Sequence, residues 1–81
     1  MINTDLPLLE RYIKASGYRR EHISKFLGMS RASFIYRMRG KVDFTISDVN
    51  KLRILLNLTD EDIIKIFFSK MLSDTHVYET A

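Results

Sequence analysis

The sequence predicts an all-α domain of five helices packed compactly around one core. Apolar residues recur at helical spacing along nearly the whole chain, and no segment alternates between apolar and polar residues over a useful length. Residues suited to helix caps and helix ends divide the periodic stretches into five. We place a single domain at residues 1–72 and expect a flexible tail at residues 73–81, which lack periodicity.

The first helix is expected over residues 6–16 and the second over residues 20–27. Thr4 or Asp5 caps the first helix, and Gly17 ends it. The apolar side chains expected to face the core are Leu9 and Ile13 in the first helix, and Ile23, Phe26 and Leu27 in the second.

The third helix is expected over residues 31–39, with Ser30 as its cap and Gly40 at its end. Phe34 and Met38 are four residues apart, so they share one face of this helix. That face is predicted to pack on the core, which leaves the other side of the helix to solvent or to a ligand.

The fourth helix is expected over residues 46–56 and the fifth over residues 60–72. Thr45 and Asp48 predict a capping box at the start of the fourth helix, and Thr59 caps the fifth. Acidic residues follow in the first turn of the fifth helix, where the helix dipole favours negative charge. The apolar stripe of the fourth helix is expected to be Ile46, Val49, Leu52 and Leu56.

The fifth helix carries more apolar residues than a single buried stripe needs. We expect Ile63, Ile64 and Phe67 to face the core. The apolar residues in excess are Ile66, Phe68, Met71 and Leu72. An exposed apolar patch marks an interface, and two-fold symmetry is the commonest oligomeric state, so we predict a homodimer through these residues. The alternative is that the first helix covers both faces.

The stretch Gly28-Met29-Ser30 separates the second and third helices and is typical of a helix-turn-helix. Glycine permits a left-handed turn, and Ser30 then caps the next helix. Ser24 supplies the small residue that a close crossing of the two helices requires. Polar residues at the start of the third helix are left to face a groove of DNA.

Positive charge is concentrated around this motif. The chain carries 13 Lys and Arg against 10 Asp and Glu, which gives a net charge of +3. Residues 19–41 hold seven of these cations and a single acid, Glu21, so this window carries +6 and the remaining residues −3. A solvated mixed surface spreads its charge, whereas a basic window on an acidic chain favours a polyanion-binding face.

With these motifs the chain resembles a five-helix Cro/CI-type domain (Xre, lambda-repressor-like), from about residue 8 to residue 68. The specific part is residues 23–31, followed by Phe34, Met38 and Gly40. It is most similar to short stand-alone regulators of temperate phages and prophages of Gram-positive bacteria, through Asp43-Phe44-Thr45 and Leu56-Asn57-Leu58-Thr59. The resemblance implies a helix-turn-helix transcriptional regulator, typically a repressor, that binds operator DNA as a dimer on a palindrome.

Carried onto this chain, the resemblance implies roles for individual residues. Arg20 would touch a phosphate and brace the third helix, Lys41 would follow the DNA backbone, and Arg31, Ala32, Ser33 and Tyr36 would enter the major groove. Side-chain chemistry adds Ile35, through a thymine methyl, and Arg37, through a base or a phosphate. It also adds phosphate contacts from Arg19, Lys25, Arg39 and the amide end of the third helix at Ser30. Two departures from the family are Arg19, where a Thr or Ser cap is usual, and the bulk of Ile35 and Tyr36.

The sequence contains few features that favour other classes of function. His22 and His76 lack metal-ligand spacing, no glycine-rich phosphate loop occurs, and no serine has a visible base partner, so no enzyme, metal or cofactor is expected. The chain has no cysteine, no apolar run that could span a bilayer and no signal peptide, so we expect a cytoplasmic protein. The serious alternative to operator binding is a protein-interaction module that modulates another phage repressor. An antitoxin is a third option, but residues 75–81 do not resemble a toxin-binding tail.

Overall fold

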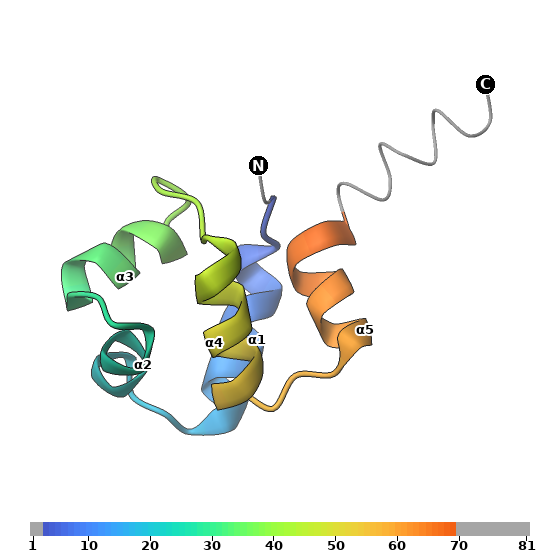
Figure 1. The fold of residues 1–81 in the computed structure, drawn as a ribbon, viewed down its shortest axis with the longest axis horizontal. Coiled ribbons are helices and arrows are strands. Elements are labelled where there is room, and N and C mark those ends of the chain that lie inside the picture. The colour runs from blue at the N-terminus through green and yellow to red at the C-terminus, as the bar shows by residue number, and fades with distance from the viewer. Residues whose placement is uncertain (1–2, 70–81) are drawn as a thin grey trace.

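The computed structural model describes residues 3–69, and over these residues every regular element is helical (Figure 1). The elements are α1 (Leu6–Ser16), α2 (Arg20–Leu27), α3 (Arg31–Met38), α4 (Ile46–Leu55) and α5 (Asp60–Ile63), which runs on into a π-helix, η1 (Ile64–Phe68). In Figure 1, α1 and α4 lie in the middle, with α2 and α3 on one side and α5 on the other. The predicted all-α class is confirmed. The predicted end of the last helix, at residue 72, and the tail at residues 73–81 lie outside the described residues.

The helices begin where the sequence places their caps. The Asp5 side chain accepts a hydrogen bond from the amide of Leu8 at 3.2 Å, which selects Asp5 over Thr4 as the cap of α1. Thr45 and Thr59 each form a complete capping box, with α4 and α5 respectively. Each cap satisfies backbone N–H groups that the first turn of a helix leaves without a partner, and so fixes the residue at which the helix starts.

One core holds the helices together. α2 packs against both α3 and α4, and α1 packs against η1. The rings of Phe44 and Phe67 meet edge to face, with their centroids 6.2 Å apart, and so tie the loop after α3 to the last helix. The buried apolar residues are Leu9, Ile13, Ile23, Leu27, Phe34, Phe44, Val49, Leu52, Leu58, Ile66 and Phe67.

The prediction that Phe26 and Ile46 face the core is wrong. Phe26 is 40% exposed and Ile46 is 60% exposed. The buried side chains of α2 are Ile23, Ser24 and Leu27, and at helical spacing Phe26 lies about a quarter of a turn or more from their centre. Ile46 lies at a similar offset from the buried face of α4, whereas Val49 and Leu52 of the predicted stripe are buried and Leu56 packs against the core.

The last helix also differs from its predicted pattern. Ile64, expected in the core, is 45% exposed, whereas Ile66, expected at a dimer interface, is completely buried within this chain. Ile63, Ile66 and Phe67, which lie in the core or pack against it, are spaced i, i+3 and i+4, so they share one face of the helix and Ile64 lies beside that face. The prediction that Ile66 lies at an interface is therefore wrong. Phe68 is half-buried and packs against the core, and Met71 and Leu72 lie outside the described residues.

Two further properties concern residues 3–69 as a whole. None of their helices combines the length and the apolar character needed to cross a membrane. Their His, Asp and Glu side chains form no group of three or more that could hold a metal ion.

Candidate nucleic-acid interface

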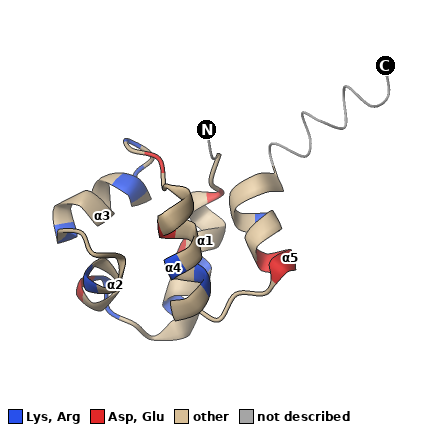
Figure 2. Cartoon of the chain, in the orientation of Figure 1, with Lys and Arg blue, Asp and Glu red and all other residues tan. Residues whose placement is uncertain are grey.

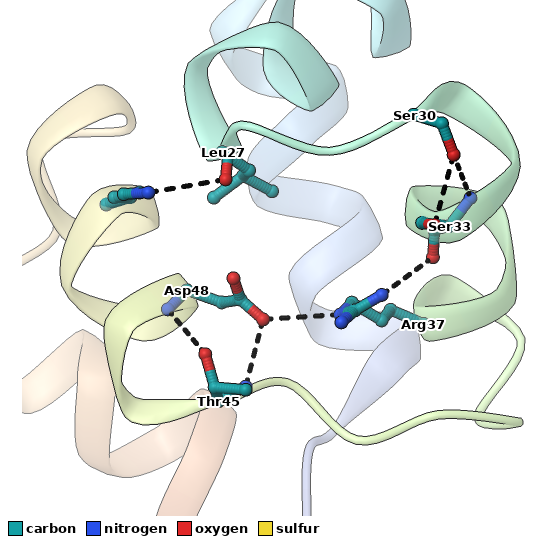
Figure 3. A network of polar contacts seen from close by, with 7 residues as sticks. Leu27, Ser30, Ser33, Arg37, Thr45 and Asp48 are labelled. Carbon is teal, nitrogen blue, oxygen red and sulfur yellow. Dashed lines mark hydrogen bonds and ion pairs between the residues drawn. The ribbon is translucent and has the colours of Figure 1, made fainter.

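The turn between α2 and α3 is tightly hydrogen-bonded. Gly28 has a φ of 73°, a left-handed conformation that a residue with a Cβ adopts at a cost, and it ends α2 three residues before α3 begins. The amide of Met29 donates to the carbonyl of Ser24 at 3.0 Å. Lys51 on α4 donates from Nζ to the carbonyl of Leu27 at 3.3 Å (Figure 3). These bonds satisfy carbonyls at the end of α2 and fix the direction in which α3 leaves it.

Ser24 is buried, as its predicted role requires, with 2% of its surface exposed. Its hydroxyl donates to the carbonyl of Glu21 at 2.9 Å, so the polar atom has a partner inside the helix. A larger side chain at this position would push α2 away from the helices packed against it.

The first turn of α3 presents its side chains outward. Ser30 accepts a hydrogen bond from the amide of Ser33 at 3.1 Å, and the two hydroxyls are 3.0 Å apart and bonded to each other. Phe34 is completely buried and anchors the opposite side of the helix. Arg31, Ala32 and Tyr36, three of the residues predicted to enter the major groove, are exposed.

Arg37 is mostly buried and bonded within the protein, unlike Arg31 at the start of the same helix. Its Nε donates to Oδ2 of Asp48 at 3.2 Å, and its Nη1 donates to the carbonyl of Ser33 at 3.3 Å (Figure 3). The side chain of Arg37 is 19% exposed and that of Asp48 is 9% exposed. A guanidinium in this arrangement joins α3 to α4, and we therefore remove Arg37 from the predicted DNA contacts.

Four exposed cations surround the outer side of α3: Arg19, Arg31, Arg39 and Lys41. Within residues 3–69, none of these four side chains forms an ion pair or a hydrogen bond. The Lys41 ammonium lies 5.7 Å from the ring centroid of Tyr36, within range of a cation–π interaction. Lys25 is also exposed, with its Nζ 4.0 Å from Oε1 of Glu21, a contact worth little in water. Figure 2 shows the contrast with α5, whose first turn is acidic.

Arg20, the first residue of α2, forms an ion pair through Nη2 with Oε1 of Glu10 on α1. This pair lines two grooves, of about 580 and 550 Å³. The other lining residues include Ile35 and Arg39 in the first groove, and Arg19 and Arg31 in the second. Ile35 is half-buried in its groove, so it is less available than Ala32 for contact with a base.

Sequence reasoning missed Glu10 and the second role of Asp48. Glu10 lies ten residues before its partner Arg20, on the preceding helix, and no local sequence pattern predicts that the two side chains pair. Asp48 was recognised as part of a capping box, which is a local signal, but its contact with Arg37 spans eleven residues. The structure thus brings the exposed predicted contacts together around α3 and assigns Arg20 and Arg37 partners within the protein. No protein-family model, curated protein or solved structure matches this chain.

Proposed function

We propose that this protein is a sequence-specific regulator that binds double-stranded DNA through a helix-turn-helix formed by α2 and α3. The observation that carries the proposal is the set of exposed, unpaired cations around the outward side of α3. Unpaired arginines and lysines at one end of a small domain repel each other, and a polyanion relieves that repulsion. The resemblance to short phage regulators makes repression the effect that we propose.

Base reading is assigned to the outward side of α3, between Arg31 and Tyr36. Arg31 is exposed at the start of the helix and can pair bidentately with the O6 and N7 atoms of guanine. Ala32 can contact a thymine methyl, and Tyr36 offers both a hydroxyl and an apolar ring. The Ser33 hydroxyl already bonds to Ser30 but keeps acceptor capacity for a base.

Phosphate binding is assigned to the residues on either side of α3. Arg19 precedes α2, and Arg39 and Lys41 follow α3, so their cations can meet the backbone on both sides of a groove that holds α3. The amides at the start of α3 add donors near Ser30, where the helix dipole favours an anion. Lys25 contributes less, because Glu21 lies beside it.

A homodimer on a palindromic operator is part of the proposal. Ile64 is 45% exposed on the last helix, and Phe68 lies half-buried on the same element. Apolar side chains at this end of the molecule, away from α3, would allow two copies to meet while both α3 helices face DNA (Figure 1). Ile66 takes no part, since it is buried in the core.

The experiment is a titration of labelled duplex DNA with the protein at several salt concentrations. The variant R39Q/K41Q removes two of the unpaired cations beside α3. The matched control R53Q/K65Q removes two cations that are paired with Asp60 and Glu61 at the other side of the fold. Weaker binding and a shallower salt dependence in the first variant, with little change in the second, support the proposal. Equal losses in both variants contradict it.

A second candidate function is binding to another regulatory protein. The observation that favours it is the exposure of Phe26 on α2 and of Ile46 and Ile54 on α4, at 40%, 60% and 71%. Exposed apolar side chains of this size suit a protein contact. This function predicts that DNA binding is weak and non-specific, and that substitutions at these three residues, rather than at Arg31, abolish the regulatory effect.

A further inference from the structure

A carboxylate, Glu10, lies among the cations of the proposed DNA-binding surface. It belongs to α1 and pairs with Arg20, and the two side chains are 27% and 40% exposed. Its Oε2 atom is buried and has no hydrogen-bond partner among residues 3–69. The pair is therefore accessible in part, and its carboxylate is incompletely satisfied in the free protein.

The pair is located where a phosphate would approach. One groove beside it contains Arg39, and the other contains Arg19 and Arg31. In the groove with Arg39, Glu10 is the one acidic lining residue. A phosphate bound between Arg20 and Arg39 would lie close to the Glu10 carboxylate, and the two negative charges would repel.

We propose that Glu10 is an electrostatic brake on DNA binding: it holds Arg20 in the free protein, and a DNA phosphate has to compete with it for the guanidinium. The inference rests on the proposed function. Carboxylate and phosphate are both bidentate partners of arginine, so they compete for the same donors. Because the competition involves phosphate and no base, Glu10 lowers the affinity for all DNA sequences alike.

The first test is E10Q, titrated with a duplex of scrambled sequence. Glutamine keeps the size of the side chain and an acceptor for Arg20, but it removes the charge. We expect binding about three- to tenfold tighter near 0.1 M salt, because one further phosphate contact releases about one counterion. The slope of log K against log salt should steepen by about 0.9. The control E61Q removes the same charge from α5, where Glu61 pairs with Lys65, and should leave the slope unchanged.

The second test separates a brake on Arg20 from a general change in charge. In an R20Q background, E10Q should no longer tighten binding, because the guanidinium that it releases is absent. Equal tightening by E10Q in both backgrounds would overturn the inference. If the wild-type protein binds DNA and E10Q binds no tighter, the inference fails while the proposed function stands. If neither protein binds DNA, both fail.

Discussion

Arg37 on α3 donates from Nε to Oδ2 of Asp48 on α4 across 3.2 Å, and the same oxygen accepts the amide of Thr45 at 3.0 Å. A single carboxylate oxygen therefore caps α4 and holds α3 (Figure 3). Since α3 buries only Phe34 completely, this polar contact does much to fix its orientation. The proposed DNA-reading helix is thus positioned by a charge pair as well as by the core.

Removing the charge of Asp48 should destabilise the fold. In D48N the side chain keeps its size, but it leaves the guanidinium of Arg37, which is 19% exposed, without a counter-ion. We expect the free energy of unfolding to fall by about 1–3 kcal/mol. D60N, which breaks the exposed pair with Arg53, should cost about 1 kcal/mol or less. Chemical denaturation of both variants checks this, and a loss in D48N no greater than in D60N would contradict the role given to the pair.

Arg31 and Arg37 should behave differently in DNA binding, although both lie on α3. R31A should lose roughly 1–3 kcal/mol of binding free energy on its preferred site and become indifferent to one base pair. R37Q should lower the free energy of unfolding and leave the base preference unchanged, because its guanidinium faces Asp48 and the Ser33 carbonyl. Competitive titration with duplexes that differ at single positions separates the two. A base preference altered by R37Q would return this residue to the DNA contacts.

Lys41 should contribute affinity without specificity. It is exposed in the loop after α3, and its charge has no acidic partner among the described residues. K41A should weaken binding to cognate and scrambled duplexes by the same factor and reduce the salt slope by about 1. K65A, which removes an exposed lysine of η1, is the matched control. A loss confined to the cognate duplex would show that Lys41 reads sequence.

The pair formed by Tyr12 and Asp62 should make stability depend on pH. The Tyr12 hydroxyl donates to Oδ1 of Asp62 at 2.7 Å. This bond is the main cause that lowers the pKa of Asp62, and the hydrogen bond from the Thr59 backbone is the second. The same bond to Asp62 is the main cause that raises the pKa of Tyr12. A lowered carboxyl pKa gives stability above the unfolded value, which is lost as the pH falls through the folded value. A raised tyrosine pKa gives stability below about pH 10, which is lost at higher pH.

Y12F removes this bond and provides the measurement. The difference in unfolding free energy between wild type and Y12F should be largest near neutral pH. It should narrow in acid, as Asp62 is protonated, and again in alkali, as Tyr12 ionises. Y18F is the control, since the Tyr18 ring stacks on His22 and its hydroxyl has no hydrogen bond in the described part of the chain. A difference that is constant across the pH range would contradict the account.

Local signals in the sequence predicted the helices well. The side chains of Ser30, Thr45 and Thr59 each accept a hydrogen bond from the backbone amide three residues further along. Their capping roles can therefore be predicted from the sequence without knowledge of the fold. The orientation of each helix was less predictable, because Ile46 and Val49 are both apolar and only packing decides which is buried.

The candidate site was predictable in part, for the same reason. The basic window at residues 19–41 predicted that Arg31 and Lys41 lie on the surface, and the structure places both there. The partners of Arg20 and Arg37 did not follow, because Glu10 and Asp48 come from other helices. The burial of Ile66 and the exposure of Ile64 did not follow either, because both residues are apolar and the packing of the last helix against α1 decides which of them is buried.

Selection from a random pool of duplex DNA, at near-physiological salt and followed by sequencing, tests the central claim most directly. Sedimentation of the free protein alongside it reports the oligomeric state. We predict a palindrome whose half-sites are centred about one helical turn apart, bound by a dimer through α3. Recovery of no enriched sequence, with only weak and salt-sensitive binding, would contradict sequence-specific DNA recognition and favour a protein partner.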